Sequence, residues 1–324
     1  MKKIGDSILV CCVAQLLTPN DINAFMQTCH GQNTLWMPVL TRREMWSLDT
    51  VMMWGTERRK HVRSICIGDQ YNHAISATQL SVVMSLHSLL YVSFHRNFDQ
   101  PVLPGMVPDS VIYVKFGGGF NHPLPAGFLP KCLKALAFGS WYNKHLGLGV
   151  LPFGLERLTF GWCFNKPMES GVLPAGLTHL TFGFGFDKPV GLEVLPPGLQ
   201  RLEFGRSFNQ RMMPKVLPVS LTHLTFGDMF NQPMPVNSLQ AGLQKLTFGR
   251  YFNQSIHTGA LPASLTHLGL GYSFDHPMES GTLPVGLRQL TIGEDYTHPL
   301  ELSGSLPHII RLPDPDVSDD ESDE

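Results

Sequence analysis

Histidine is the residue type in this sequence that most readily suggests chemistry, because imidazole can bind metal ions or transfer protons. The chain has 14 histidines, and His179, His223 and His267 recur at intervals of 44 residues. At equivalent positions in every second strand of a repeated ladder, they would lie ~10 Å apart, twice the spacing of neighbouring strands. A zinc ion needs its ligands at ~2.0–2.1 Å, so these histidines cannot share one. We expect no metal site and no cofactor.

Residues 117–119 are three consecutive glycines, which suggest a phosphate-binding loop. Such a loop needs a Lys-Ser/Thr pair and the start of a helix after the glycines. Phe120 and Asn121 follow instead. The chain also lacks the G-x-S-x-G pattern of a serine nucleophile. The sequence therefore predicts no catalytic residues and a protein that is not an enzyme.

The remaining candidates for a site are polar residues that repeat with a 22-residue period. One set is basic or titratable, and a second set, two residues further along, is mostly threonine. The first set is Arg157, His179, Arg201, His223, Lys245 and His267, and the second is Thr159, Thr181, Thr225 and Thr247. Stacked in register, they would form a face that binds an acidic or phosphorylated protein partner. The alternative is an exposed strand face on which threonine is favoured by its β propensity alone.

A repeated unit of 22 residues has to position these columns. Its clearest copy is Leu221–Met234, in which Leu224 and Phe226 alternate with polar residues, as in a strand. Gly227 lets the backbone turn, and Phe230 returns to the core. Asn231 can bond backbone groups that the turn leaves unpaired. One copy cannot bury its own apolar face, so the copies must stack into a ladder of parallel strands.

Eleven copies can be recognised in the chain. They begin at residues 62, 89, 111, 133, 155, 177, 199, 221, 243, 265 and 287. We therefore expect a repeat solenoid over residues 62–305, with the leucines and phenylalanines of each strand inside. At ~4.8 Å between strands, the ladder would be roughly 48 Å long.

The motif Leu-x-x-Leu-x-Phe-Gly-x-x-Phe-Asn-x-Pro-Leu/Met resembles the FNIP repeat, a relative of the leucine-rich repeat. The resemblance covers about residues 60–305. It implies an arc similar to that of leucine-rich-repeat proteins, which binds other proteins.

Residues 1–48 precede the repeat and have a helical pattern. Apolar residues recur at helical spacing over Ile8–Leu17, and Thr18 or Asn20 can cap a second helix. Six residues resemble a divergent F-box: Leu17, Asp21, Phe25, Cys29, Trp36 and Leu40. This resemblance implies that the segment binds a Skp-type adaptor and that the chain is the substrate-recognition subunit of a cullin-type ubiquitin ligase.

Two other interpretations of residues 1–48 stay open. The segment can be a helical cap that shields the first copy, in which case the protein is a stand-alone scaffold with no ligase link. It can also be a secretory signal peptide, because Lys2-Lys3 precede the apolar run.

The two segments beside the repeat are polar. Residues 49–61 are expected to form a linker, with Arg58-Arg59-Lys60 as a nuclear signal, an anion patch or part of a solvated helix. Residues 306–324 are acidic and are expected to be a disordered tail. Ser318 and Ser322 precede acidic residues there, which resembles casein-kinase-type phosphorylation sites.

Composition limits the remaining classes of partner. Charged residues make up 15% and the formal net charge is −2, so the chain has no overall basic field to attract nucleic acid, and we expect no nucleic-acid partner. No run approaches the ~20 apolar residues of a membrane span, so we expect no membrane partner. None of the six cysteines forms a C-x-x-C pair. Free thiols fit a reducing compartment, the cytoplasm or the nucleus.

Overall fold

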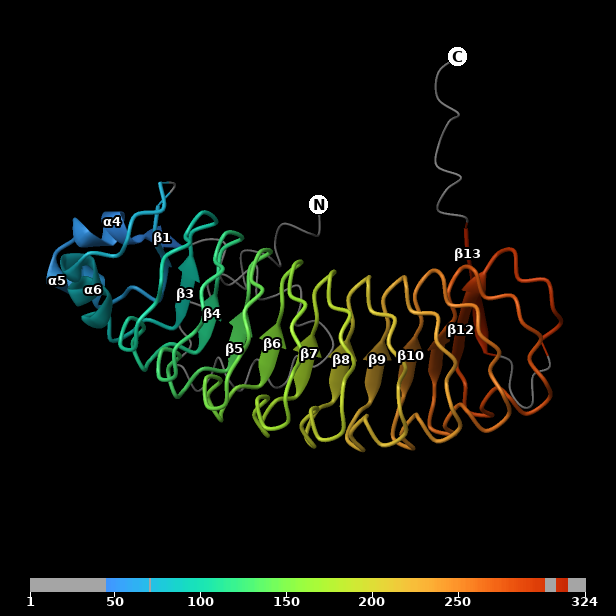
Figure 1. Cartoon of the computed structure of the whole chain (residues 1–324). Helices are drawn as coiled ribbons and strands as arrows, with labels where there is room; N and C mark the ends of the chain where they lie inside the picture. The colour runs from blue at the N-terminus through green and yellow to red at the C-terminus, as the bar shows by residue number, and fades with distance from the viewer. Residues whose placement is uncertain (1–44, 70, 301–306, 314–324) are drawn as a thin grey trace, which may run out of the picture.

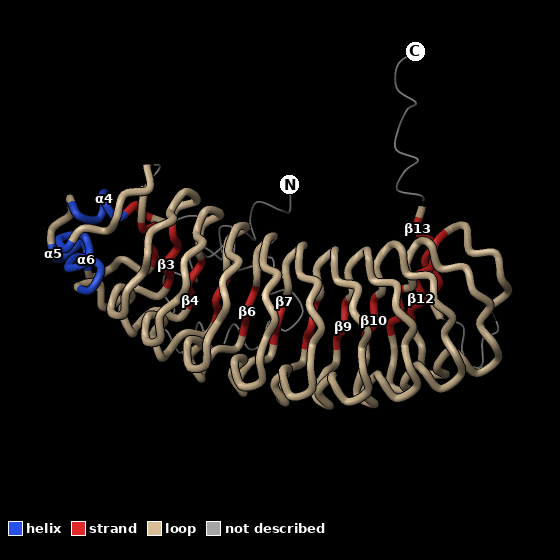
Figure 2. Tube along the Cα trace, viewed as in Figure 1, coloured by secondary structure: helices blue, strands red, loops and turns tan. Residues whose placement is uncertain are grey.

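The structure is a computed structural model that describes residues 45–69, 71–300 and 307–313. They form an elongated coil in which parallel strands lie side by side in chain order (Figure 1). The strands are β1 Trp46–Ser47, β2 Ser64–Ile67, β3 Tyr91–Phe94, β4 Tyr113–Lys115, β5 Ala135–Ala137, β6 Arg157–Thr159, β7 His179–Thr181, β8 Arg201–Glu203, β9 His223–Thr225, β10 Lys245–Thr247, β11 His267–Gly269, β12 Gln289–Gly293 and β13 His308–Leu312. Most of each turn of the coil is loop (Figure 2).

The register of the strands confirms the predicted repeat. Each residue of β10 pairs with the residue 22 positions later in β11, as Leu246 does with Leu268. Strands β2–β12 correspond to the eleven predicted copies, and the leucines and phenylalanines predicted to lie inside are buried. The protein is therefore a parallel β-solenoid.

The sheet has one more strand at each end than predicted. Strand β13 pairs with β12 over five residue pairs, so His308–Leu312 belongs to the ladder and not to the acidic tail. Strand β1 pairs with β2, and Leu48 lies in the hydrophobic core. The predicted boundaries at residues 305 and 48 are therefore wrong, because both segments find strand partners. Thirteen strands extend the ladder to ~58 Å.

Two columns of stacked aromatic rings fill the core. Phe226 lies 5.6 Å from both Phe204 and Phe248 in the first column, measured between ring centroids. It lies 3.8 Å from Phe230, which belongs to the second column. Tyr142 replaces phenylalanine in the second column and stacks on its neighbours in the same way. Stacking adds to the stabilisation that burial of these large rings supplies.

An uninterrupted series of side-chain hydrogen bonds links successive turns at the Phe-Asn positions. Each side chain accepts a hydrogen bond from the backbone amide of its counterpart in the next turn, at 2.7–3.1 Å. The accepting residues are Asn72, Asp99, Asn121, Asn143, Asn165, Asp187, Asn209, Asn231, Asn253 and Asp275. This confirms that asparagine satisfies backbone groups that the loops leave unpaired.

Glycine is required in each Phe-Gly pair for a different reason from the one predicted. Gly227 does not adopt a positive φ. A Cβ atom added there would overlap the backbone carbonyl oxygen of Gly205 in the preceding turn. The position therefore needs glycine because two backbones approach closely.

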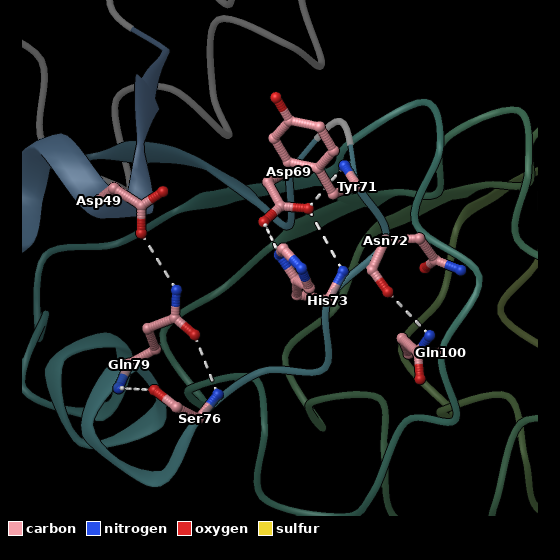
Figure 3. A network of polar contacts seen from close by, with 8 residues as sticks. All are labelled: Asp49, Asp69, Tyr71, Asn72, His73, Ser76, Gln79 and Gln100. Atoms are coloured by element: carbon pink, nitrogen blue, oxygen red, sulfur yellow. Dashed lines mark hydrogen bonds and ion pairs between the residues drawn. The ribbon is translucent and has the colours of Figure 1, made fainter.

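Three helices cover the N-terminal end of the coil within the described residues: α4 Leu48–Met52, α5 Thr56–Arg59 and α6 Ala77–Met84 (Figure 1). Ser76 and Gln79 form a capping box that starts α6. The amide of Gln79 also donates to Asp49 of α4 at 3.1 Å, which ties the two helices together (Figure 3). Helices α4 and α6 continue the core, since Val51 and Val83 are buried.

The same network orders the loop between β2 and α6. Asp69 accepts hydrogen bonds from the backbone amide of Tyr71 and from the ring of His73, at 2.9 and 2.6 Å (Figure 3). The bond from His73 is the main cause that lowers the pKa of the Asp69 carboxyl. Gln100 in the next turn donates to the carbonyl of Asn72 at 2.9 Å.

Residues 49–61, expected to form a linker, contain most of α4 and all of α5, and Val51 packs in the hydrophobic core. The Arg58 guanidinium lies 3.9 Å from the ring centroid of Trp54. Arg59 donates to the carbonyl oxygen of Val51 at 3.1 Å, near the end of α4, and Lys60 pairs with Glu57 at 2.6 Å. These basic side chains hold the cap together through local contacts.

Candidate partner-binding face

The basic and titratable residues predicted to stack do so in one column. Consecutive pairing of β6 to β11 sets Arg157, His179, Arg201, His223, Lys245 and His267 next to one another in register. Five of the six are half-buried, and Lys245 is exposed. The leucine that follows each of them points inward and is buried. We call this series the basic column.

The second predicted set lies beside the basic column, two residues further along each strand. Thr159, Thr181, Thr225 and Thr247 occupy it together with Glu203 and Gly269. Glu203 is the one acidic residue of this set, and its carboxylate accepts a hydrogen bond from Thr181 at 3.4 Å. The two columns together present cations and hydroxyl donors on one face of the sheet.

A threonine directly before each histidine fixes the imidazole ring. Thr222 Oγ1 lies 3.1 Å from the backbone carbonyl oxygen of Gln200 and 2.9 Å from Nδ1 of His223. The hydroxyl donates its single proton to the carbonyl, so Nδ1 of His223 carries the hydrogen that Oγ1 accepts. Nε2 is then the nitrogen that titrates. The same contacts orient His179 and His267.

The surroundings of His223 and Arg157 disfavour the charged forms of these two residues. Burial lowers the pKa of His223, and the positive charges of Arg201, Lys245 and His267 lower it further. Burial also lowers the pKa of the Arg157 guanidinium. A bound anion would offset both the lost hydration and the mutual repulsion of these groups.

Two grooves lie where this face meets the loops that follow the strands. The larger, of about 690 Å³, is lined by Lys245 and His267 of the basic column and by Arg250, Leu312 and Pro313. The smaller, of about 510 Å³, lies at the other end of the sheet. Its lining residues include Cys66, Tyr91, Ser93, Arg96 and Lys115.

The other predicted residues of the site fall outside the described residues. These are the F-box-like positions Leu17, Asp21, Phe25, Cys29, Trp36 and Leu40, and the serines Ser318 and Ser322. The segment considered as a signal peptide lies outside as well. Among the described helices, none is both long and apolar enough to cross a lipid bilayer. The described part of the chain holds no group of three or more His, Cys, Asp or Glu side chains suited to a metal ion.

Sequence reasoning missed two features of this face. The threonines that orient the histidines could have been found, because Thr-His-Leu recurs at residues 178, 222 and 266. Arg250 could not, since its place beside the column depends on how the loops after the strands fold.

Comparison with known protein families and structures identifies the repeat. The model of the FNIP Repeat matches residues 120–161, 142–185, 186–229, 230–273 and 274–311. Each match spans roughly two of the 22-residue copies. No curated protein matches the chain.

The solved structures that match this chain include two leucine-rich-repeat proteins. One is described as CroV588, a novel circular leucine-rich-repeat protein structure, with 34% identity and a TM-score of 0.66. The match covers 78% of this chain and 40% of that protein, so this chain spans less than half the length of the solved relative. The other is a leucine-rich repeat protein from Bacteroides ovatus ATCC 8483, with 16% identity, a TM-score of 0.20, and coverage of 78% and 69%.

The family matches include all the strands that carry the basic column, β6–β11. They also include the Phe-Gly and Phe-Asn positions whose stacking and hydrogen bonds hold the turns together. Since the matches together span more than half of the chain, the chain belongs to the FNIP repeat family.

Proposed function

We propose that this protein is a non-catalytic interaction module whose basic column binds a protein partner through acidic or phosphorylated groups. The observation that carries this proposal is the unbroken register of six basic or titratable residues from Arg157 to His267. Carboxylates and phosphates are the natural partners of such a row, because guanidinium and ammonium groups form charge-assisted hydrogen bonds with both.

Repulsion among the cations of the column favours a binding function over an exposed strand face selected only for β propensity. Arg157, Arg201 and Lys245 are the permanent cations of the column, and they lie on alternate strands, ~10 Å apart. Their mutual repulsion is mildly destabilising. Burial lowers the pKa of His223, and the neighbouring cations lower it further, so a proton on this ring is disfavoured until an anion binds. Any polar residue would suit a solvated strand face, so β propensity gives no reason to concentrate cations there.

We propose further that the chain recruits its target to a cullin-type ubiquitin ligase in the cytoplasm or the nucleus. The support is the resemblance of residues 17–40 to an F-box, which implies binding of a Skp-type adaptor. The described helices favour adaptor binding by the N-terminal segment over a role as a helical cap. Helix α4 contacts α6, β1 and β2, so a cap over the first strands exists without residues 1–44.

The alternative is a stand-alone scaffold that uses the same face without a ligase. The two functions differ in whether the chain binds a Skp-type adaptor. The test is to purify the tagged full chain and a variant lacking residues 1–44, and to titrate each with purified Skp-type adaptor. The cut falls before Met45 because Leu48 is buried in the core.

Under the ligase proposal the full chain binds the adaptor and the shortened chain does not, while both keep the same circular dichroism spectrum. If the full chain fails to bind, the stand-alone scaffold is the better description. Equal binding by both chains would place the adaptor site outside the F-box-like segment and overturn the assignment.

A further inference from the structure

The larger groove lies at the carboxyl ends of the last strands, where the basic column ends. Gly269 occupies the position that threonine holds in the neighbouring strands, and the missing side chain hollows the face. Lys245 and His267 of the basic column line the groove, together with Arg250 from the loop that follows β10.

The last described residues of the chain, Leu312 and Pro313, form part of the wall of this groove. Residues 314–324 follow directly, with the sequence DPDVSDDESDE. Seven of these eleven residues are acidic and none is basic. The segment with the most concentrated negative charge in the sequence is therefore covalently attached at the edge of a cationic groove.

The charges that face the groove are complementary to this segment. Lys245, Arg250 and His267 are basic or titratable. Asp228 is the acidic residue of the lining, and its carboxylate pairs with Arg206 at 3.4 Å. A carboxylate-rich strand can therefore approach the groove without meeting an uncompensated negative charge.

The distances suit the length of the segment. Eleven extended residues reach ~36 Å at ~3.3 Å per residue. From β13 the chain crosses three strand spacings, ~14 Å, to Lys245, and five spacings, ~24 Å, to Arg201. Arg157 is seven spacings away, ~34 Å, at the limit of the reach.

We propose that residues 314–324 bind in this groove and along the basic column, so that the chain occupies its own recognition face. The proposal deepens the function proposed above and rests on it in one respect, because tail and target would compete for the same residues. Phosphorylation of Ser318 and Ser322 would add about −1.5 to −2 charge at each site and tighten the contact. A target would then have to displace the tail. Only a target with enough negative charge to compete with the tail would be bound.

The test compares two forms of the full chain. In the neutral-tail chain, every Asp and Glu of residues 314–324 is replaced by Asn or Gln. A fluorescein-labelled synthetic peptide of residues 314–324 is titrated into each form, and binding is followed by fluorescence anisotropy. The peptide should bind the neutral-tail chain at least about tenfold more tightly than the wild-type chain, whose tethered tail competes at a high effective concentration. The same peptide with phosphoserine at both serines should bind more tightly still.

Charge reversal in the neutral-tail chain locates the contact. Lys245→Glu combined with Arg250→Glu should weaken peptide binding at least about tenfold, or ~1.4 kcal/mol. Lys215→Glu is the matched control, because Lys215 is exposed in a loop and the equivalent position of the preceding turn already holds Glu193. Equal peptide affinity for the wild-type and neutral-tail chains would overturn the proposal, as would equal weakening by the control. Neither adaptor nor target is present, so failure of the ligase or target proposals leaves this result unchanged.

Discussion

The side-chain Oδ1 of Asn209 accepts a hydrogen bond of 2.9 Å from the backbone amide of Asn231 in the next turn of the coil. The same oxygen accepts a second hydrogen bond from the Gln232 amide at 3.1 Å. Each turn thus satisfies donors of the following turn in the loops, far from the strand hydrogen bonds. The turns are consequently bonded on two sides of the core.

Replacement of this oxygen should destabilise the coil locally. Asn209→Ala leaves the amide of Asn231 without its acceptor, and we expect a loss of ~1–3 kcal/mol in the free energy of unfolding. Asn209→Asp should be much milder, because Asp187 performs the same role one turn earlier at 3.0 Å. Urea denaturation of both variants checks this. Similar losses for alanine and aspartate would show that the hydrogen bond is not the cause.

The aromatic columns should dominate the stability of the core. Phe226 is 2% exposed, and Phe226→Ala should cost ~3–5 kcal/mol, the usual range for a buried phenylalanine. Phe153 is 81% exposed, so Phe153→Ala is a matched control that should change stability by less than about 0.5 kcal/mol. Thermal and urea denaturation measure both. A mild effect at Phe226 would contradict the packed core.

One substitution should stabilise the protein. The Tyr142 hydroxyl is buried and has no hydrogen-bond partner among the described residues. Burial raises the pKa of this hydroxyl, which reflects its loss of hydration. Tyr142→Phe removes the unsatisfied group and restores the phenylalanine of the neighbouring turns, so we expect a gain of about 1 kcal/mol in the free energy of unfolding. A lower melting temperature for this variant would indicate that the hydroxyl has a role in the core.

Charge reversal on the basic column should weaken binding of an anionic partner. A short synthetic peptide of aspartate, glutamate and phosphoserine serves as the probe. Its affinity for the chain with Arg157→Glu, Arg201→Glu and Lys245→Glu should fall at least about tenfold, and added salt should weaken binding to the unmodified chain. Lys215→Glu should leave it unchanged. If the triple variant keeps both its affinity and its circular dichroism spectrum, the column is only a solvated strand face and does not bind anions.

Binding of the same probe should depend on pH through His223. Its pKa is lowered by burial and by Arg201, Lys245 and His267, so the free face holds it neutral near pH 7. A bound anion raises that pKa again, and binding takes up protons. A version of the probe with aspartate and glutamate alone is used here, because the second pKa of phosphoserine, ~6, falls in this interval. Its affinity should therefore rise as the pH falls from ~7.5 to ~6, while its carboxylates stay charged.

Two measurements check this prediction. Calorimetric titration in buffers of different ionisation enthalpy should detect the proton uptake, and His223→Gln should reduce it. In the absence of the probe, the stability of the fold should change in the opposite direction and fall as the pH falls. A lowered folded-state pKa stabilises the fold above the unfolded value of ~6.5 and loses that contribution as the pH falls below it. Affinity that is independent of pH over this interval would contradict the role of His223.

The sequence by itself determined the solenoid and the two columns. A 22-residue period without drift requires each residue to stack on its counterpart in the next copy, because any other pairing would expose the apolar positions. The register of Leu246 with Leu268, and of Lys245 with His267, followed from that spacing alone. The F-box-like residues of positions 17–40 and the serines of the tail remain predictions.

Only the tertiary structure decided the ends of the coil and the groove. Trp46–Ser47 and His308–Leu312 fall outside the 22-residue spacing, and they become strands because the sheet offers them an edge to pair with. The reason for Gly227 likewise depends on the backbone of Gly205 in the turn before it. Gly269, Arg250 and Pro313 line the larger groove together, although they come from different turns of the coil. Their proximity arises from contacts between turns of the coil, which no local pattern of residues encodes.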